Sequence, residues 1–68
     1  MNVFILVQEG RSADEGYSII EVFKEMFALR DKIKKKYPSY KQIKGTQIYY
    51  SDKENKYLRI FDREISGE

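Results

Sequence analysis

The chain has 68 residues, a formal net charge of +2, and charged side chains at 35% of its positions. It contains no cysteine and no histidine, which excludes disulfide bonds, thiolate metal sites and histidine acid–base catalysis. Hydrophobic residues make up 41% and aromatic residues 15%, too many for a disordered chain. We expect one small domain over residues 1–68, of marginal stability because so short a chain buries only about 60% of its unfolded surface.

No apolar run approaches the roughly 18 residues that a membrane-spanning helix needs. The run Val3–Val7 is short and no basic segment precedes it, so it does not match a signal peptide. We predict a cytoplasmic protein with no membrane partner, and the lack of cysteine agrees with that compartment.

The chain opens with a segment typical of a β-strand. Residues 2–8 (NVFILVQ) are β-branched and aromatic and lead to Gly10, which predicts a strand. Five consecutive apolar residues indicate that both faces of this strand are covered, and therefore that it is an inner strand. Residues 9–16 are polar and end in glycine, which predicts a loop.

Residues 17–23 (YSIIEVF) fit two structures. As a helix, Ser18 and Glu21 would form a capping box, and the apolar spacing continues to Tyr37. As a strand, the segment could pair with residues 2–8, and its density of strand formers favours this choice. The helix remains the alternative. A strand would place four alternate residues on one face: Tyr17, Ile19, Glu21 and Phe23.

The next stretch is typical of an amphipathic helix over residues 24–37. Its apolar stripe has spacings of three and four residues, and Pro38 ends the helix because proline cannot continue it. Residues 39–45 are predicted to be a connection. The members of the stripe are Met26, Leu29, Ile33 and Tyr37.

Two further strands are predicted at residues 46–51 and 56–65, joined by a hairpin loop at 52–55. Asn55 suits a left-handed backbone conformation in that loop. The predicted order is β-β-α-β-β. This is an α+β fold with an antiparallel sheet of about four strands and one helix packed on one face.

One helix covers only one side of such a sheet, so the alternation in 56–65 indicates what the other side carries. We assign Leu58 and Ile60 to the helix side. The open side then holds Tyr57, Arg59, Phe61 and Arg63, joined by Tyr49 and Phe4 if the strand registers agree. Protein interfaces are enriched in these residue types, although ordinary cross-strand packing produces the same pattern.

A second candidate surface is basic. Residues 32–44 carry six lysines and no acid, whereas the rest of the chain is mildly acidic. Lysines near tyrosines suit phosphates and stacked bases of RNA or single-stranded DNA, but a solvated helix end would look alike. The candidate residues are Lys34, Lys35, Lys36, Tyr40, Lys41 and Lys44.

The sequence offers no constellation for catalysis. Its serines have no histidine to activate them, and the acids at 14–15 and 52–54 fall in predicted loops. Phosphate-binding glycine loops and the calcium-loop pattern are missing. We therefore expect a protein that is not an enzyme, with no catalytic residue, no metal site and no cofactor.

Two hydrophobic segments carry a resemblance. VFILV at residues 3–7, followed by IIEVFKE at 19–25, resembles a class of very small uncharacterised domains common in phage and bacterial genomes. These open with a V-[FY]-I-L strand and continue with an I-I-G-V-[FY] strand that leads into a helix. The resemblance covers about residues 2–37, with Glu21 where the pattern favours glycine. It implies a strand at 17–23 and an accessory or phage-encoded protein, but no activity.

These observations predict a non-enzymatic interaction module. It would bind another protein through the open sheet side, as a small modulator or inhibitor of a host protein, and we also expect it to form homodimers over that side or through an edge strand. Binding of nucleic acid through the lysine-rich segment is the alternative. The predicted partner-binding residues are Tyr49, Tyr57, Arg59, Phe61 and Arg63.

Overall fold

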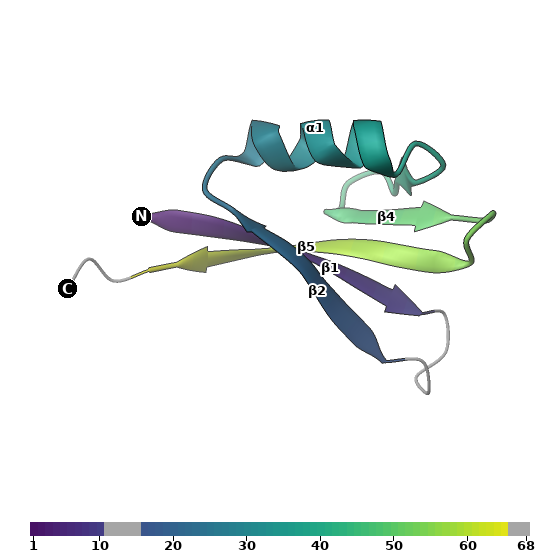
Figure 1. Ribbon diagram of the computed structural model, residues 1–68, viewed down its shortest axis with the longest axis horizontal. Helices are drawn as coiled ribbons and strands as arrows, with labels where there is room; N and C mark the ends of the chain where they lie inside the picture. Colours follow the sequence, from purple (N-terminus) through teal and green to yellow (C-terminus); the bar gives the residue numbers. More distant parts are fainter. Residues whose placement is uncertain (11–15, 66–68) are drawn as a thin grey trace.

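The computed structural model describes residues 1–10 and 16–65, which form an antiparallel sheet with one helix on one side (Figure 1). In chain order the elements are β1 (Asn2–Gly10), β2 (Tyr17–Phe23), α1 (Met26–Lys36), β3 (Lys41–Gln42), β4 (Ile48–Ser51) and β5 (Lys56–Glu64). The strands lie side by side in the order β2-β1-β5-β4-β3. The α+β prediction is confirmed, but the described residues form five strands rather than about four.

Strand β1 is an inner strand, as its unbroken apolar run predicts. It pairs antiparallel with β2 on one side and with β5 on the other. The strand continues to Gly10, so the predicted loop begins later than Glu9; residues 11–15 of that loop lie outside the described residues. The pairing of β1 with β5 is the longest in the sheet and runs from Asn2 opposite Glu64 to Gly10 opposite Lys56.

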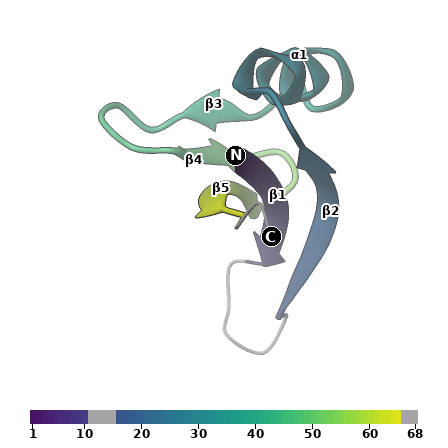
Figure 2. The same cartoon turned by 90° about the vertical axis from the view of Figure 1, so that its left-hand side faces the viewer.

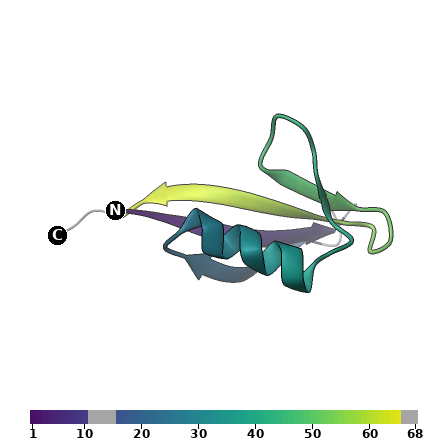
Figure 3. The same cartoon turned by 90° about the horizontal axis from the view of Figure 1, so that it is seen from above.

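Helix α1 lies over the β1–β2 side of the sheet (Figure 3). The predicted apolar stripe faces the sheet: Leu29 and Ile33 are buried, and Met26 and Tyr37 pack at the edge of the same cluster. Leu58 and Ile60 also lie on this side, as predicted. The buried residues of the hydrophobic core are Leu6, Phe23, Leu29, Ile33, Tyr40, Leu58 and Ile60.

The helix is shorter than predicted at both ends. At its start, Glu25 still has an extended backbone, with φ of −128° and ψ of 135°, because the chain leaves β2 extended before it turns over the sheet. At its end, the Tyr37 N–H donates to the Ile33 carbonyl at 2.8 Å. Pro38 follows, and the helix stops there as the sequence predicts.

Residues 17–23 form a strand, which resolves the ambiguity of that segment. Ser18 and Glu21 do not form a capping box. The Glu21 carboxylate instead forms an ion pair with the Lys32 ammonium of α1, and this contact ties the helix to β2. The hydrogen bond from Lys32 to Glu21 raises the pKa of the lysine above its ordinary value of 10.5.

The alternation of side chains between the two faces of the sheet is interrupted partway along β2. Glu21 pairs with Leu6 of β1, but the next β1 residue, Val7, pairs with Ile19. Ile20 is therefore an extra residue, a β-bulge, and the alternation is reset across it. The prediction that four alternate residues share one face is wrong for this reason. Tyr17 and Ile19 lie on one face, and Glu21 and Phe23 lie on the other.

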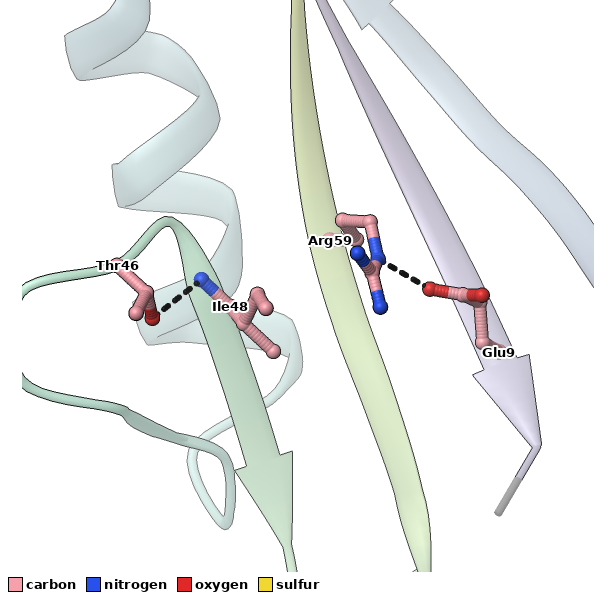
Figure 4. A network of polar contacts seen from close by, with 4 residues as sticks. All are labelled: Glu9, Thr46, Ile48 and Arg59. Carbon is pink, nitrogen blue, oxygen red and sulfur yellow. Dashed lines mark hydrogen bonds and ion pairs between the residues drawn. The ribbon is translucent and has the colours of Figure 1, made fainter. Parts of the chain in front are cut away.

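The predicted connection at 39–45 contains a short strand, β3, that the sequence pattern does not reveal. Its two residues are polar and exposed, so they carry no alternation. The adjoining turn holds them against β4: Gly45 has a φ of +81°, and the Ile48 N–H donates to Thr46 Oγ1 at 3.2 Å (Figure 4). Because Thr46 belongs to this turn, β4 begins at Ile48 and not at residue 46.

The hairpin loop at 52–55 is where the sequence places it. Asn55 has a φ of 58°, the left-handed conformation that asparagine tolerates better than most residues. The loop is anchored by Ser51, which is fully buried. Its Oγ lies 2.9 Å from Ser39 Oγ and accepts a hydrogen bond from the Glu54 N–H at 3.1 Å.

A matched pair of substitutions in α1 tests the packing. Leu29 is completely buried, whereas Phe27, two residues earlier, is 72% exposed. We expect Leu29→Ala to lower the free energy of unfolding by about 2–5 kcal/mol, because it leaves a cavity in the core. We expect Phe27→Ala to change it by less than about 0.5 kcal/mol. Urea denaturation followed by circular dichroism measures both, and equal losses would contradict the orientation of the helix.

Candidate functional site: the open sheet face

The open face is defined here as the sheet surface turned away from α1, and none of the described elements lies over it (Figure 2). The four β5 residues predicted to lie on it do so, because they alternate with Leu58 and Ile60, which pack in the core beneath the helix. Strand pairing places Tyr57 beside Glu9, Arg59 beside Val7, Phe61 beside Ile5 and Arg63 beside Val3.

Tyr49 does not belong to the open face. It pairs with Leu58 and packs against the core on the helix side, and Phe4 does the same on β1. The register between β4 and β5 decides this, and a one-residue difference moves every side chain to the other face. Tyr50 is on the open face instead, and its ring centroid lies 4.9 Å from that of Tyr57.

Strands β1 and β2 also contribute to this face, which the sequence pattern did not reveal. Ile5, Val7 and Glu9 lie on it by alternation along β1. From β2, Tyr17 and Ile19 lie beside Glu9 and Val7, and Val22 lies beside Ile5. The apolar composition of both strands was visible in the sequence. The bulge at Ile20 was not, and it is the bulge that brings Tyr17, Ile19 and Val22 to one side.

The exposed apolar side chains gather around a hollow of about 290 Å³ on this face. Tyr17 and Ile19 are 71% and 62% exposed, whereas Val7 at the centre is only 4% exposed. Large exposed apolar patches on soluble proteins often mark interaction sites. The lining residues are Ile5, Val7, Glu9, Tyr17, Ile19, Phe61 and Arg63.

The two arginines of the open face differ in their surroundings. Arg59 Nε donates to Glu9 Oε2 at 2.5 Å, an ion pair between neighbouring strands (Figure 4). Arg63 has no ion pair with another described residue. The positive charge of Arg59 is therefore compensated within the sheet, whereas Arg63 has no such counterpart among residues 1–10 and 16–65.

In the lysine-rich segment, Tyr40 is not placed to stack on a base. Its side chain is 7% exposed and lies in the core. Gln8 Nε2 donates to its hydroxyl at 3.1 Å, and the ring meets that of Tyr37 edge-on, with centroids 5.7 Å apart. Burial raises the pKa of Tyr40 above its ordinary value of 10.0. The structure thus removes the aromatic component from the predicted nucleic-acid surface.

The lysines of that segment lie among both acidic and basic neighbours. Lys35 forms an ion pair with Asp31 at 3.1 Å. Lys36 lines a hollow that also contains Lys53 and Glu54, and Lys41 lines another that contains Asp52 and Lys53. Acidic side chains are therefore interspersed with the basic ones. Four lysines are exposed without an ion pair to another described residue: Lys34, Lys36, Lys41 and Lys44.

Residues 1–10 and 16–65 contain no group of three or more acidic side chains arranged to hold a metal ion. They also contain no helix of the length and apolar character needed to cross a bilayer. Comparison of the chain with protein-family models, curated proteins and solved structures found no significant match. The resemblance to small phage and bacterial domains stays a prediction.

The burial of Tyr40 yields a prediction about stability in alkali, and its hydrogen bond with Gln8 yields one about stability at neutral pH. Because the pKa of Tyr40 is raised in the folded chain, the unfolded chain loses this proton first, and stability falls as the pH rises above 10.0. We expect Tyr40→Phe to cost about 1 kcal/mol at neutral pH through the lost hydrogen bond. We also expect the stability of the Tyr40→Phe variant to fall less steeply with rising pH than that of the wild type.

Urea denaturation at neutral and alkaline pH measures both effects. Tyr17→Phe is the control, because Tyr17 is largely exposed; it should leave the neutral stability unchanged. The loss of the Lys32–Glu21 ion pair in alkali is common to all variants and cancels. An alkaline slope in Tyr40→Phe as steep as in the wild type would contradict the burial argument.

Proposed function

We propose that this protein is a non-enzymatic interaction module that binds another protein through the open face and acts as a small modulator or inhibitor of that protein. The observation that carries the proposal is the group of exposed apolar side chains around the hollow on β2, β1 and β5. Aromatic and arginine side chains dominate binding energy at protein interfaces. Tyr17, Phe61 and Arg63 supply both types.

The geometry favours a protein over a small molecule as the occupant. The hollow lies on one face of a sheet and has exposed apolar rims, whereas small-molecule sites are usually clefts that enclose most of the ligand. An apolar centre with charged groups at its edge is the usual anatomy of a protein interface. Glu9 with Arg59 and the separate Arg63 provide that charged edge.

Nucleic-acid binding is the second candidate, supported by the exposed lysines of residues 34–44. It would rest on phosphate contacts alone, because Tyr40 is buried. Proteins that bind single strands usually combine such contacts with aromatic stacking. The open face is therefore the better supported surface.

A matched pair of double variants tests the proposal. Phe61→Ala with Arg63→Ala removes an aromatic and an arginine from the open face, while Arg59 is kept so that Glu9 retains its partner. Phe27→Ala with Arg30→Ala removes the same types from the exposed side of α1. In capture from host lysate, we expect the first variant to lose at least about 2 kcal/mol of affinity, roughly thirty-fold. The second should capture as the wild type does.

Equal capture by both double variants would contradict the assignment of the site, provided that circular dichroism shows both to be folded. Nuclease treatment of the lysate separates the two candidate functions. We expect the captured protein to remain bound after treatment. Two results together would favour nucleic acid: the captured species is lost on nuclease treatment, and a Lys34→Ala, Lys36→Ala, Lys41→Ala variant fails to capture it. Binding of nucleic acid should also weaken steeply as the salt concentration rises.

A further inference from the structure

We propose that the segment of the partner protein that contacts the open face is acidic as well as apolar: an apolar side chain fills the hollow, and a carboxylate beside it forms an ion pair with Arg63. This inference rests on the proposed function, because it states the chemistry of the partner of the same surface. Two observations carry it: the apolar centre of the hollow, and one cation at its edge without an ion pair to another described residue.

The charges around the hollow do not cancel. Strands β2, β1 and β5 place three charged side chains on the open face: Glu9, Arg59 and Arg63. Glu9 and Arg59 form an ion pair with each other, so each already has its counterpart. Asp62 and Glu64, the neighbours of Arg63 in sequence, alternate to the other side of the sheet. The charge that remains beside the hollow is therefore the positive charge of Arg63.

Arg63 lies close enough to the hollow for one short segment to reach both. It lines the hollow together with Phe61 and Ile5, and its row lies two residues from theirs, about 7 Å along the strands. Alternate residues of an extended segment have the same spacing, and residues four apart in an α-helix rise by about 6 Å. A carboxylate near an apolar residue in the sequence of the partner can therefore meet Arg63 while the apolar side chain lies in the hollow.

The chemistry of arginine favours a carboxylate at this position. The guanidinium of Arg63 is exposed, and its planar set of N–H donors matches the two oxygens of a carboxylate. An apolar contact beside the pair excludes water in part, which strengthens the attraction. A lysine or arginine of the partner at the same place would be repelled. The cation thus selects both the charge of the partner and its orientation along the strands.

Two other occupants fit the face less well. A phosphate would also bind arginine, but nucleic-acid affinity comes from several phosphate contacts, and the strands around the hollow offer one uncompensated cation. The centre of the hollow is aliphatic, with Val7 and Ile19, whereas bound bases stack on aromatic rings. A second open face is also a poor match, because the carboxylate that it would present, Glu9, is already paired with Arg59.

Selection from a random peptide library displayed on phage tests the inference with a defined probe. The wild-type protein is the bait, and peptides that also bind the Phe61→Ala variant are discarded, so that the retained peptides depend on the hollow. We expect the retained sequences to be enriched in aspartate and glutamate beside apolar residues, relative to the unselected library. The same selection on Arg63→Glu should enrich lysine and arginine instead.

Arg30→Glu is the charge-matched control. It makes the same change in net charge on the exposed side of α1, away from the open face, and should still select acidic peptides. Circular dichroism shows whether each variant is folded. Tyr17→Ala gives a second filter for peptides that depend on the hollow, because Tyr17 lies on the opposite rim from Phe61 and is 71% exposed.

Synthetic peptides measure the size of the effect. In a retained peptide, replacement of the acidic residue by its amide should weaken binding to the wild type by about fivefold, as for a well-placed exposed ion pair. The same replacement should leave binding to Arg63→Gln unchanged. The difference between the two peptides should shrink as the salt concentration rises, because salt screens the pair.

Retained peptides without acidic enrichment, or with an enrichment that Arg63→Glu does not change, would overturn the inference. The proposed function would stand, because those peptides still bind through Phe61. Displacement of a retained peptide by single-stranded RNA, or a wild-type dimer that Phe61→Ala dissociates, would also overturn the inference and assign the face to that occupant. A library that yields no peptide dependent on Phe61 or Tyr17 would overturn it too, and capture from lysate then decides the proposed function separately.

Discussion

The structure depends on a mismatch of size between one eleven-residue helix and the sheet that it packs on. Burial of apolar side chains is the main favourable term in folding, and here it is complete on one side of the sheet only. The helix side holds a closed core in which even Ser51 and the Tyr40 hydroxyl have hydrogen-bond partners. On the other side, the same strands leave aromatic and aliphatic side chains in contact with water.

The open face is more than the unused side of a sheet, because its polar groups are ordered relative to one another. Arg59 and Glu9 pair across β5 and β1, while Arg63 has no such partner among the described residues. The face therefore has a direction along the strands, with a compensated pair at one end and an uncompensated cation at the other. A featureless apolar surface would accept any hydrophobic partner, whereas the placement of these charges would discriminate between orientations of the proposed partner.

The sequence was a good guide to the elements and a partial guide to the site. The helix stripe, the stop at Pro38, the left-handed Asn55 and the outward β5 residues follow from local rules that act within a few residues. Tyr49, Tyr40 and the β2 residues depend on register, burial and a bulge, which arise only when distant strands pair. Short β3 was missed because Lys41 and Gln42 carry no apolar alternation, and only the turn at Gly45 and Thr46 holds them in the sheet.

The bulge at Ile20 has a consequence for solubility as well as for the site. Strand β2 stands at the border of the sheet, and a regular border strand is a template onto which further chains can add without limit. An extra residue interrupts the even spacing of its free backbone groups and makes such addition unfavourable. The kink that turns Tyr17 and Ile19 outward thus also guards against fibre growth.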